Sequence, residues 1–247
     1  LFDITVGYSS ASHLAINKTS NTQHNKKLNI YSQMAGMLMG HSGSGDVIRF
    51  DKDGDLAGTT GDEINDAIFI NFSRLLQKDE IKKGSFKIVF GGGQKQGQGG
   101  LHSRVTVTDD GAENNYRVNS AVGDYGILSC SVIANQAYSG TAAQGSAKSG
   151  LVGLLFYQAG VAVFSSSIFQ GATAGTAPVG AVAQDCLMLV DDSVTDYTTI
   201  SGALTGTSIS GTCDAIRRRI YDISFNNTTE LNSTIHFCRV NNNEYNY

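Results

Sequence analysis

Two neighbouring apolar runs near the middle of the chain place the strongest constraint on its fold. Residues 151–157 read Leu-Val-Gly-Leu-Leu-Phe-Tyr and residues 161–164 read Val-Ala-Val-Phe, with a turn at residues 158–160 between them. Short apolar runs of this composition, bounded by turn residues, are typical of strands. Because polar residues do not alternate within them, we expect a hairpin over residues 151–169 that is covered on both faces.

Alternating runs on both sides of this hairpin predict further strands, separated by turn residues. One helix is expected at residues 28–39, where Leu28, Tyr31 and Leu38 recur at helical spacing before Gly40, and the polar residues 17–27 before it read as a connector. The sequence therefore predicts a mainly β fold with two or three short helices, either β-sandwich-like or mixed α+β, built from antiparallel hairpins. The further strands are expected at residues 2–8, 67–72, 85–90, 101–108, 116–118 and 125–133.

The C-terminal part of the chain predicts a second hairpin. Residues 214–220 are compatible with a helical turn, residues 221–225 alternate as a strand, and the Asn- and Thr-rich residues 226–230 favour a turn. Residues 232–240 alternate again, so we expect a hairpin over residues 221–240.

A chain of 247 residues is long enough for one large β-rich domain or two smaller ones. One division gives an N-terminal part, residues 1–110, that holds the helix at 28–39. The C-terminal part, residues 111–247, then holds the hairpins at 151–169 and 221–240. One continuous domain is the alternative.

The composition is polar but weakly charged. Charged residues make up 16% of the chain and apolar residues 40%, and the formal net charge is -4. Such a surface suits a subunit packed against neighbours, because few charges lose their hydration on assembly. The acidic balance argues against nucleic acid as the main ligand. No apolar run approaches the roughly 20 residues of a spanning helix, and no signal-peptide pattern follows Leu1, so we expect no membrane partner.

Three carboxylates stand at alternate positions of a short segment, Asp51, Asp53 and Asp55. Carboxylates spaced in this way can converge on one calcium ion. However, Leu56 stands where an EF-hand loop has its glycine, and Asp62 stands where it has its bidentate glutamate. A solvated hairpin turn is therefore the preferred interpretation, no metal is expected, and calcium binding stays open as the alternative.

Three consecutive arginines, Arg217, Arg218 and Arg219, lie at the expected C-terminal helical turn. Neighbouring helical residues point in different directions, which does not favour a phosphate-binding patch. We expect these side chains to pair with separate acidic partners or to contact neighbouring subunits.

No catalytic pattern in the sequence is complete. Residues 40–45 resemble a nucleophile elbow, but Ser44 stands where a glycine is required and a helix is expected before it. The glycine-rich residues 91–100 lack the ending of a phosphate-binding loop, and the four cysteines form no close pair. We therefore expect neither an enzyme nor a cofactor. The alternative, a glycan-degrading enzyme, would need paired carboxylates; the candidates are Asp191 with Asp192, and the group Asp62, Glu63 and Asp66.

Five segments carry a resemblance to known sequences: residues 70–76, 78–86, 225–234, 237–239 and 243–247. They resemble a family of structural proteins from marine tailed bacteriophages of the T-even-like myovirus (cyanophage) type. It implies a virion protein, assembled in the host cytoplasm, whose partners are copies of itself and other virion structural proteins.

The resemblance does not fix a location within the particle; the preferred expectation is the tail side, in a baseplate, neck or collar position. A capsid decoration protein and a receptor-binding fibre module that recognises a host-surface glycan are the alternatives. Besides the three arginines, the interface candidates are Phe237, Tyr245 and Tyr247.

Overall fold

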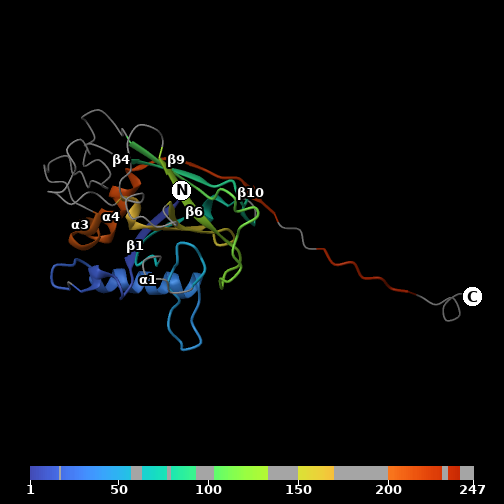
Figure 1. The fold of residues 1–247 in the computed structure, drawn as a ribbon, viewed down its shortest axis with the longest axis horizontal. Helices are drawn as coiled ribbons and strands as arrows, with labels where there is room; N and C mark the ends of the chain where they lie inside the picture. Colours follow the sequence, from blue (N-terminus) through green and yellow to red (C-terminus); the bar gives the residue numbers. More distant parts are fainter. Residues whose placement is uncertain are drawn as a thin grey trace, which may run out of the picture.

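The computed structural model describes residues 1–16, 18–56, 63–76, 79–92, 103–132, 150–169, 200–229 and 233–239. These residues form one curled eight-stranded antiparallel sheet, a two-stranded sheet and a few short helices (Figure 1). The prediction of a mainly β fold with few short helices is confirmed.

The spatial order of the large sheet is β1-β2-β8-β7-β6-β5-β4-β9, and every neighbouring pair is antiparallel. The predicted hairpin is confirmed for residues 151–165, since β7 and β8 pair from Phe156↔Val161 to Gly153↔Phe164. Its expected continuation to residue 169 is wrong, because Ser166–Phe169 form a 3-10 turn. In chain order the strands of the sheet are β1 (Asp3–Tyr8), β2 (Asp66–Asn71), β4 (Lys87–Gly92), β5 (Ser103–Thr108), β6 (Tyr125–Val132), β7 (Leu151–Phe156), β8 (Val161–Ser165) and β9 (Ile220–Ser224).

The smaller sheet pairs β3 (Glu80–Ile81) with β10 (Asn227–Thr228). The described helices are α1 (His24–Leu38), α3 (Ile200–Gly206) and α4 (Ile209–Arg217), with short 3-10 turns at His13–Ala15, Ser73–Leu75 and Ser166–Phe169. The predicted strand at residues 116–118 is wrong, because Arg117 makes only an isolated bridge with Tyr125.

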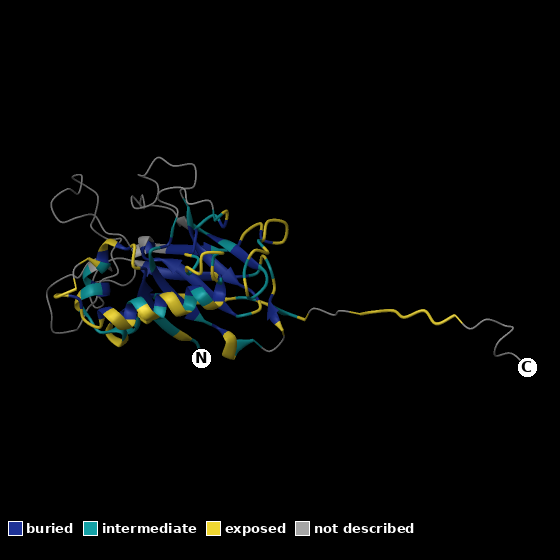
Figure 2. Cartoon of the chain, turned by 90° about the horizontal axis from the view of Figure 1, so that it is seen from below, coloured by how far each residue is buried: buried dark blue, intermediate teal, exposed yellow. Residues whose placement is uncertain are grey.

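The sheet separates two apolar clusters. Successive residues of β2 alternate between them, because side chains along a strand point to opposite faces: Ile68 and Ile70 join one cluster, Ala67 and Phe69 the other. Helix α1 covers the second cluster with Tyr31, Ala35 and Leu38. Figure 2 shows the buried residues concentrated in the sheet and on the inner side of the helices.

A ring contact across the first cluster shows how strongly the sheet curls. The rings of Phe90 on β4 and Phe164 on β8 lie 5.5 Å apart at an interplanar angle of 87°. Strands β7, β6 and β5 separate these two strands in the sheet order. The edge-to-face contact is therefore made across the hollow of the curl, and it contributes to the core in addition to its buried area.

The predicted C-terminal hairpin at 221–240 is wrong. Strand β9 pairs with β4, with Ile223 opposite Ile88 and Ile220 opposite Phe90. The described residues 233–239 form no strand and are exposed. On β4, strand β9 gains the buried apolar residues Ile88 and Phe90 as cross-strand partners, and cross-strand pairs of this kind stabilise a sheet.

Helix α1 lies unusually close to β1 at one glycine. A Cβ atom added at Gly7 would lie 2.7 Å from the main-chain oxygen of Lys27 and 2.9 Å from the main-chain nitrogen of Tyr31. Both neighbours are backbone atoms, so a side chain at this position would force the helix away from the strand.

We therefore expect Gly7→Ala to lower the free energy of unfolding by about 1–3 kcal/mol through overpacking. Chemical denaturation monitored by circular dichroism measures this loss. The matched control is Gly43→Ala, because an added Cβ there meets no atom within 4 Å. Equal stability of the two variants would contradict the close approach of α1 to β1.

The start of α1 carries buried polar side chains, although this part of the sequence reads as a polar connector. The His24 ring nitrogen Nδ1 lies 2.8 Å from the Tyr8 hydroxyl. The side chain of Lys27 is fully buried, and its Nζ donates hydrogen bonds to the main-chain oxygens of Leu204 and, at 2.9 Å, Thr207. Residues 24–27 belong to α1 and not to a connector. The hydrogen bonds satisfy the polar groups that this part of the helix buries.

Lys27 connects α1 to the C-terminal end of α3, where carbonyl groups have no partner within the helix. We expect Lys27→Met to lower the free energy of unfolding by about 1–3 kcal/mol, because the two carbonyls lose their donor. Lys26→Met, at an exposed position of the same helix, is the matched control in thermal and chemical denaturation.

The parent protein and Lys27→Met also differ in how the free energy of unfolding depends on pH. Burial lowers the pKa of Lys27 from 10.5 to about 8. Between these values the unfolded chain binds a proton that the folded chain does not, so the stability of the parent rises with pH across this window. Lys27→Met lacks this rise. Parallel stability curves for the two proteins would contradict the burial of the ammonium group.

Candidate functional site

The three arginines of the C-terminal helix have different surroundings. Arg217 and Arg218 pair with the same carboxylate, that of Asp214, at 2.6 and 2.9 Å, and all three of these side chains are partly exposed. Both arginines therefore have an acidic partner, and they share it, since Asp214 precedes them by one helical turn. Arg219 is only 5% exposed and lies inside the fold.

Residues 233–239 form an extended arm beyond the last paired strand, β10. Every residue of the arm is exposed, and Figure 2 shows it projecting away from the body of the protein. Its two large apolar side chains, Ile235 and Phe237, are 73% and 92% exposed. The other two interface candidates, Tyr245 and Tyr247, lie outside the described residues.

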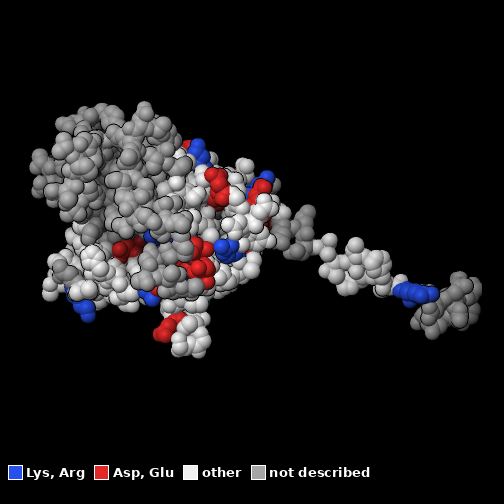
Figure 3. Space-filling view, viewed as in Figure 1, with Lys and Arg blue, Asp and Glu red and all other residues white. Residues whose placement is uncertain are grey.

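An open groove lies at the opposite end of the body from the arm. Its apolar lining comes from Phe2 and Ile4 at β1 and from Ile209 and Cys213 on α4, and its volume is about 640 Å³. Lys26, Asp3 and Arg217 add charged groups to the lining. The described surface seen in Figure 3 is mostly uncharged, with acidic and basic side chains in small groups, in keeping with the weakly charged composition.

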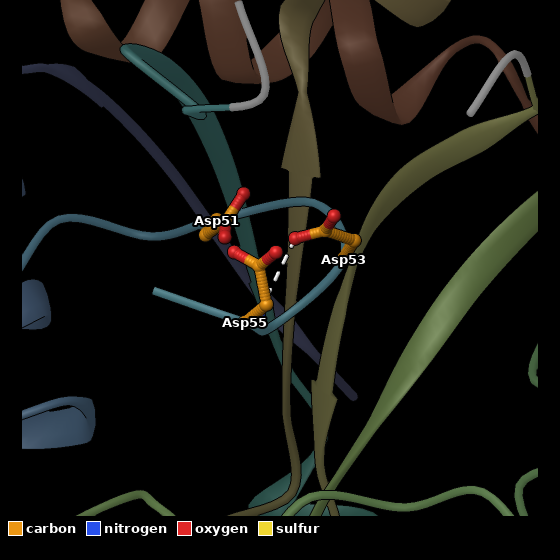
Figure 4. Close-up of side chains that lie close together, drawn as sticks. All are labelled: Asp51, Asp53 and Asp55. Atoms are coloured by element: carbon orange, nitrogen blue, oxygen red, sulfur yellow. Dashed lines mark hydrogen bonds between the residues drawn. The ribbon is translucent and has the colours of Figure 1, made fainter. Parts of the chain in front are cut away.

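The carboxylates of Asp51, Asp53 and Asp55 converge in the loop after α1 (Figure 4). One oxygen from each lies within 4.8 Å of the other two. The loop is closed by a main-chain bridge from Asp51 to Glu63 and by the Leu56 N–H, which donates to Asp51 Oδ2 at 3.1 Å. The structure thus brings together the three residues whose spacing offers calcium binding as the alternative to a solvated turn.

The backbone of this loop turns where an EF-hand loop does. Leu56 has a φ of 57°, in the left-handed region that the glycine of an EF-hand loop provides. A side chain in that region costs about 1–2 kcal/mol. Leu56 therefore adopts the conformation without glycine, at some expense in stability. Asp62 lies outside the described residues, and the carboxylate of Glu63 pairs with Arg49 at 2.5 Å.

The electrostatics of the three carboxylates are unfavourable for Asp51. Its side chain is buried, at 7% exposure, while Asp53 is half-buried and Asp55 exposed. Burial first, and then the hydrogen bond and charge of Asp53, raise the pKa of Asp51 to about 6. Its Oδ1 atom is buried and accepts no hydrogen bond. Oxygens that only accept hydrogen bonds lie close together here, and a proton or a cation relieves such an arrangement.

Of the carboxylates considered for a glycan-degrading site, the structure describes Glu63 and Asp66, and each has a partner of its own. Asp66 accepts a hydrogen bond from the Ser12 hydroxyl, and Glu63 is paired with Arg49. Asp62, Asp191 and Asp192 lie outside the described residues. Within the part of the chain that the structure describes, no helix has the length and apolar character needed to cross a membrane.

Comparison with known proteins adds no relative from which a function could be transferred. No protein-family profile, no curated protein and no solved structure matches the chain.

The sequence does not single out Ile235 as an interface residue, because it lies inside a predicted strand. The alternation of Ile235 with Phe237 is the signal that indicates an apolar side of the arm.

Proposed function

We infer that the chain is a structural subunit of a tailed-bacteriophage virion and assembles with copies of itself and with other virion proteins through its C-terminal arm. The observation that carries this proposal is the exposed arm with Ile235 and Phe237. The resemblance of residues 225–234 and 237–239 to marine phage structural proteins supports it. A tail-side position in the baseplate, neck or collar is the preferred location.

The arm has the pattern of a segment that becomes ordered against a partner. Ile235 and Phe237 are two positions apart, so in an extended chain they point to the same side. Burying both side chains removes apolar area worth about 1.5–3 kcal/mol for each. Single exposed apolar side chains are common on protein surfaces, but neighbouring ones on one side of a segment mark contact surfaces.

The edge of the large sheet offers an acceptor for such a segment. Strand β9 is the last strand in the sheet order, and among the described residues no strand pairs with its outer side. Tyr221, Asp222 and Ser224 on this strand are exposed. An edge strand presents alternate backbone N–H and C=O groups to an incoming strand. A neighbouring copy therefore provides both a backbone edge and an arm.

The weak surface charge also favours assembly with neighbouring subunits. Charged groups lose hydration when subunits pack together, and a surface with few of them loses little. The surface seen in Figure 3 carries acidic and basic groups in small numbers, so a broad contact between subunits meets little electrostatic opposition.

Removing the apolar side of the arm tests this proposal. We expect Phe237→Ala to weaken self-association at least about tenfold, because large aromatic anchors dominate interface energies. Truncation after Thr229, which keeps the paired strand β10, is expected to abolish self-association. Sedimentation velocity across a range of protein concentrations measures both effects.

His236→Ala is the matched control, because His236 is also exposed but points to the other side of an extended arm. It is expected to associate like the parent. A parent chain that stays monomeric at all concentrations and does not bind other virion proteins would overturn the proposal, as would unchanged association after truncation.

A further inference from the structure

We propose that the loop formed by Asp51, Asp53 and Asp55 binds one divalent cation of the calcium class. The site is distinct from the arm and does not depend on the proposed function. It uses only oxygen ligands, which is the ligand type that Ca²⁺ prefers, whereas zinc and copper favour nitrogen and sulfur.

The first step is geometric. The three carboxylate oxygens lie within 4.8 Å of one another. Ligands on a single Ca²⁺ stand about 2.3–2.6 Å from the ion and are therefore up to about 5 Å apart. Figure 4 shows the side chains of Asp53 and Asp55 directed toward that of Asp51 across the loop. One ion between them reaches an oxygen of each residue without a change of fold.

The second step is independent of the clustering. Asp51 is only 7% exposed. Its Oδ1 atom is buried and accepts no hydrogen bond. An unsatisfied buried carboxylate oxygen loses its hydration and gains nothing in return. The neighbouring carboxylates cannot donate a hydrogen bond to it while they are ionised. A bound cation supplies the missing partner and also neutralises the repulsion among the three groups.

The third step concerns how the loop is held in place. Asn119 Nδ2 donates to the main-chain oxygen of Gly54 at 3.4 Å, and the Tyr125 hydroxyl donates to Asn119 Oδ1 at 2.6 Å. Tyr125 begins β6 and is fully buried. The acidic loop is thus anchored to the sheet before any ion binds. A preformed set of ligands needs less ordering on binding, and a bound ion stabilises the folded chain by mass action.

Binding is measured on the full chain after treatment with EDTA. Calorimetric titration with CaCl₂ at about pH 7.5, where exposed carboxylates are ionised, is expected to show saturable binding at one site. Terbium replaces calcium as a luminescent probe, and the buried Tyr125 provides nearby excitation. NaCl at the same ionic strength is the control for general screening.

Two variants separate a metal site from a merely acidic surface. We expect Asp53→Asn and Asp55→Asn each to weaken calcium binding at least about tenfold, because each removes a charged ligand. The side chain of Asp55 is exposed, so loss of binding in Asp55→Asn does not arise from misfolding. Asp46→Asn, at an exposed aspartate before the loop, is the matched control and is expected to bind like the parent.

Two results would overturn the proposal. One is the absence of saturable heat and of terbium luminescence with the parent chain. The other is binding that persists unchanged in both Asp53→Asn and Asp55→Asn. Because neither variant touches residues 233–239, failure of this site leaves the arm's role in assembly untouched, and the reverse also holds.

Discussion

The pairing of β2 with β8 is the constraint on which the rest of the structure depends. Residues 67–71 of the N-terminal part pair with residues 161–165 of the middle hairpin, so β1 and β2 become part of the same sheet as β7, β6, β5 and β4. Contacts between segments so distant in sequence are slow to form, but they fix many others once made. With β2 in place, α1 lies on β1 at Gly7 and the loop that carries Asp51 is held against Tyr125 of β6.

The sequence predicted the elements whose signals are local. The apolar runs at residues 151–157 and 161–164 identify a buried hairpin, and the helical spacing around Tyr31 identifies α1. The prediction of a C-terminal hairpin is wrong because alternation in residues 221–225 indicates a strand but not its partner. The strand pairs instead with β4, next to the apolar residues Ile88 and Phe90. Lys27 was missed for a similar reason: its burial depends on carbonyl groups of Leu204 and Thr207, far along the chain. The three aspartates were recognised from spacing alone, whereas the turn at Leu56 that brings them together depends on backbone conformation that leucine rarely adopts.

The arm and the acidic loop have different relations to the folded body. The described residues of the arm are all exposed, among them Ile235 and Phe237, and in the proposed function these two side chains contact a partner. The acidic loop is anchored to the sheet, and the buried Asp51 within it is destabilising until a proton or cation is present. In the two proposals, an ion supplies a partner to the buried Asp51 and a neighbouring subunit covers the apolar side chains of the arm.

The central claim is that this chain assembles through its arm in a phage particle. A cryo-EM map of the virion that contains this chain tests the claim most directly. The account predicts repeated, symmetry-related copies on the tail side, with residues 233–239 ordered against the neighbouring subunit and with Phe237 buried in that contact. A particle without the chain, or a map in which the body is bound but residues 233–239 touch no neighbour, would contradict it.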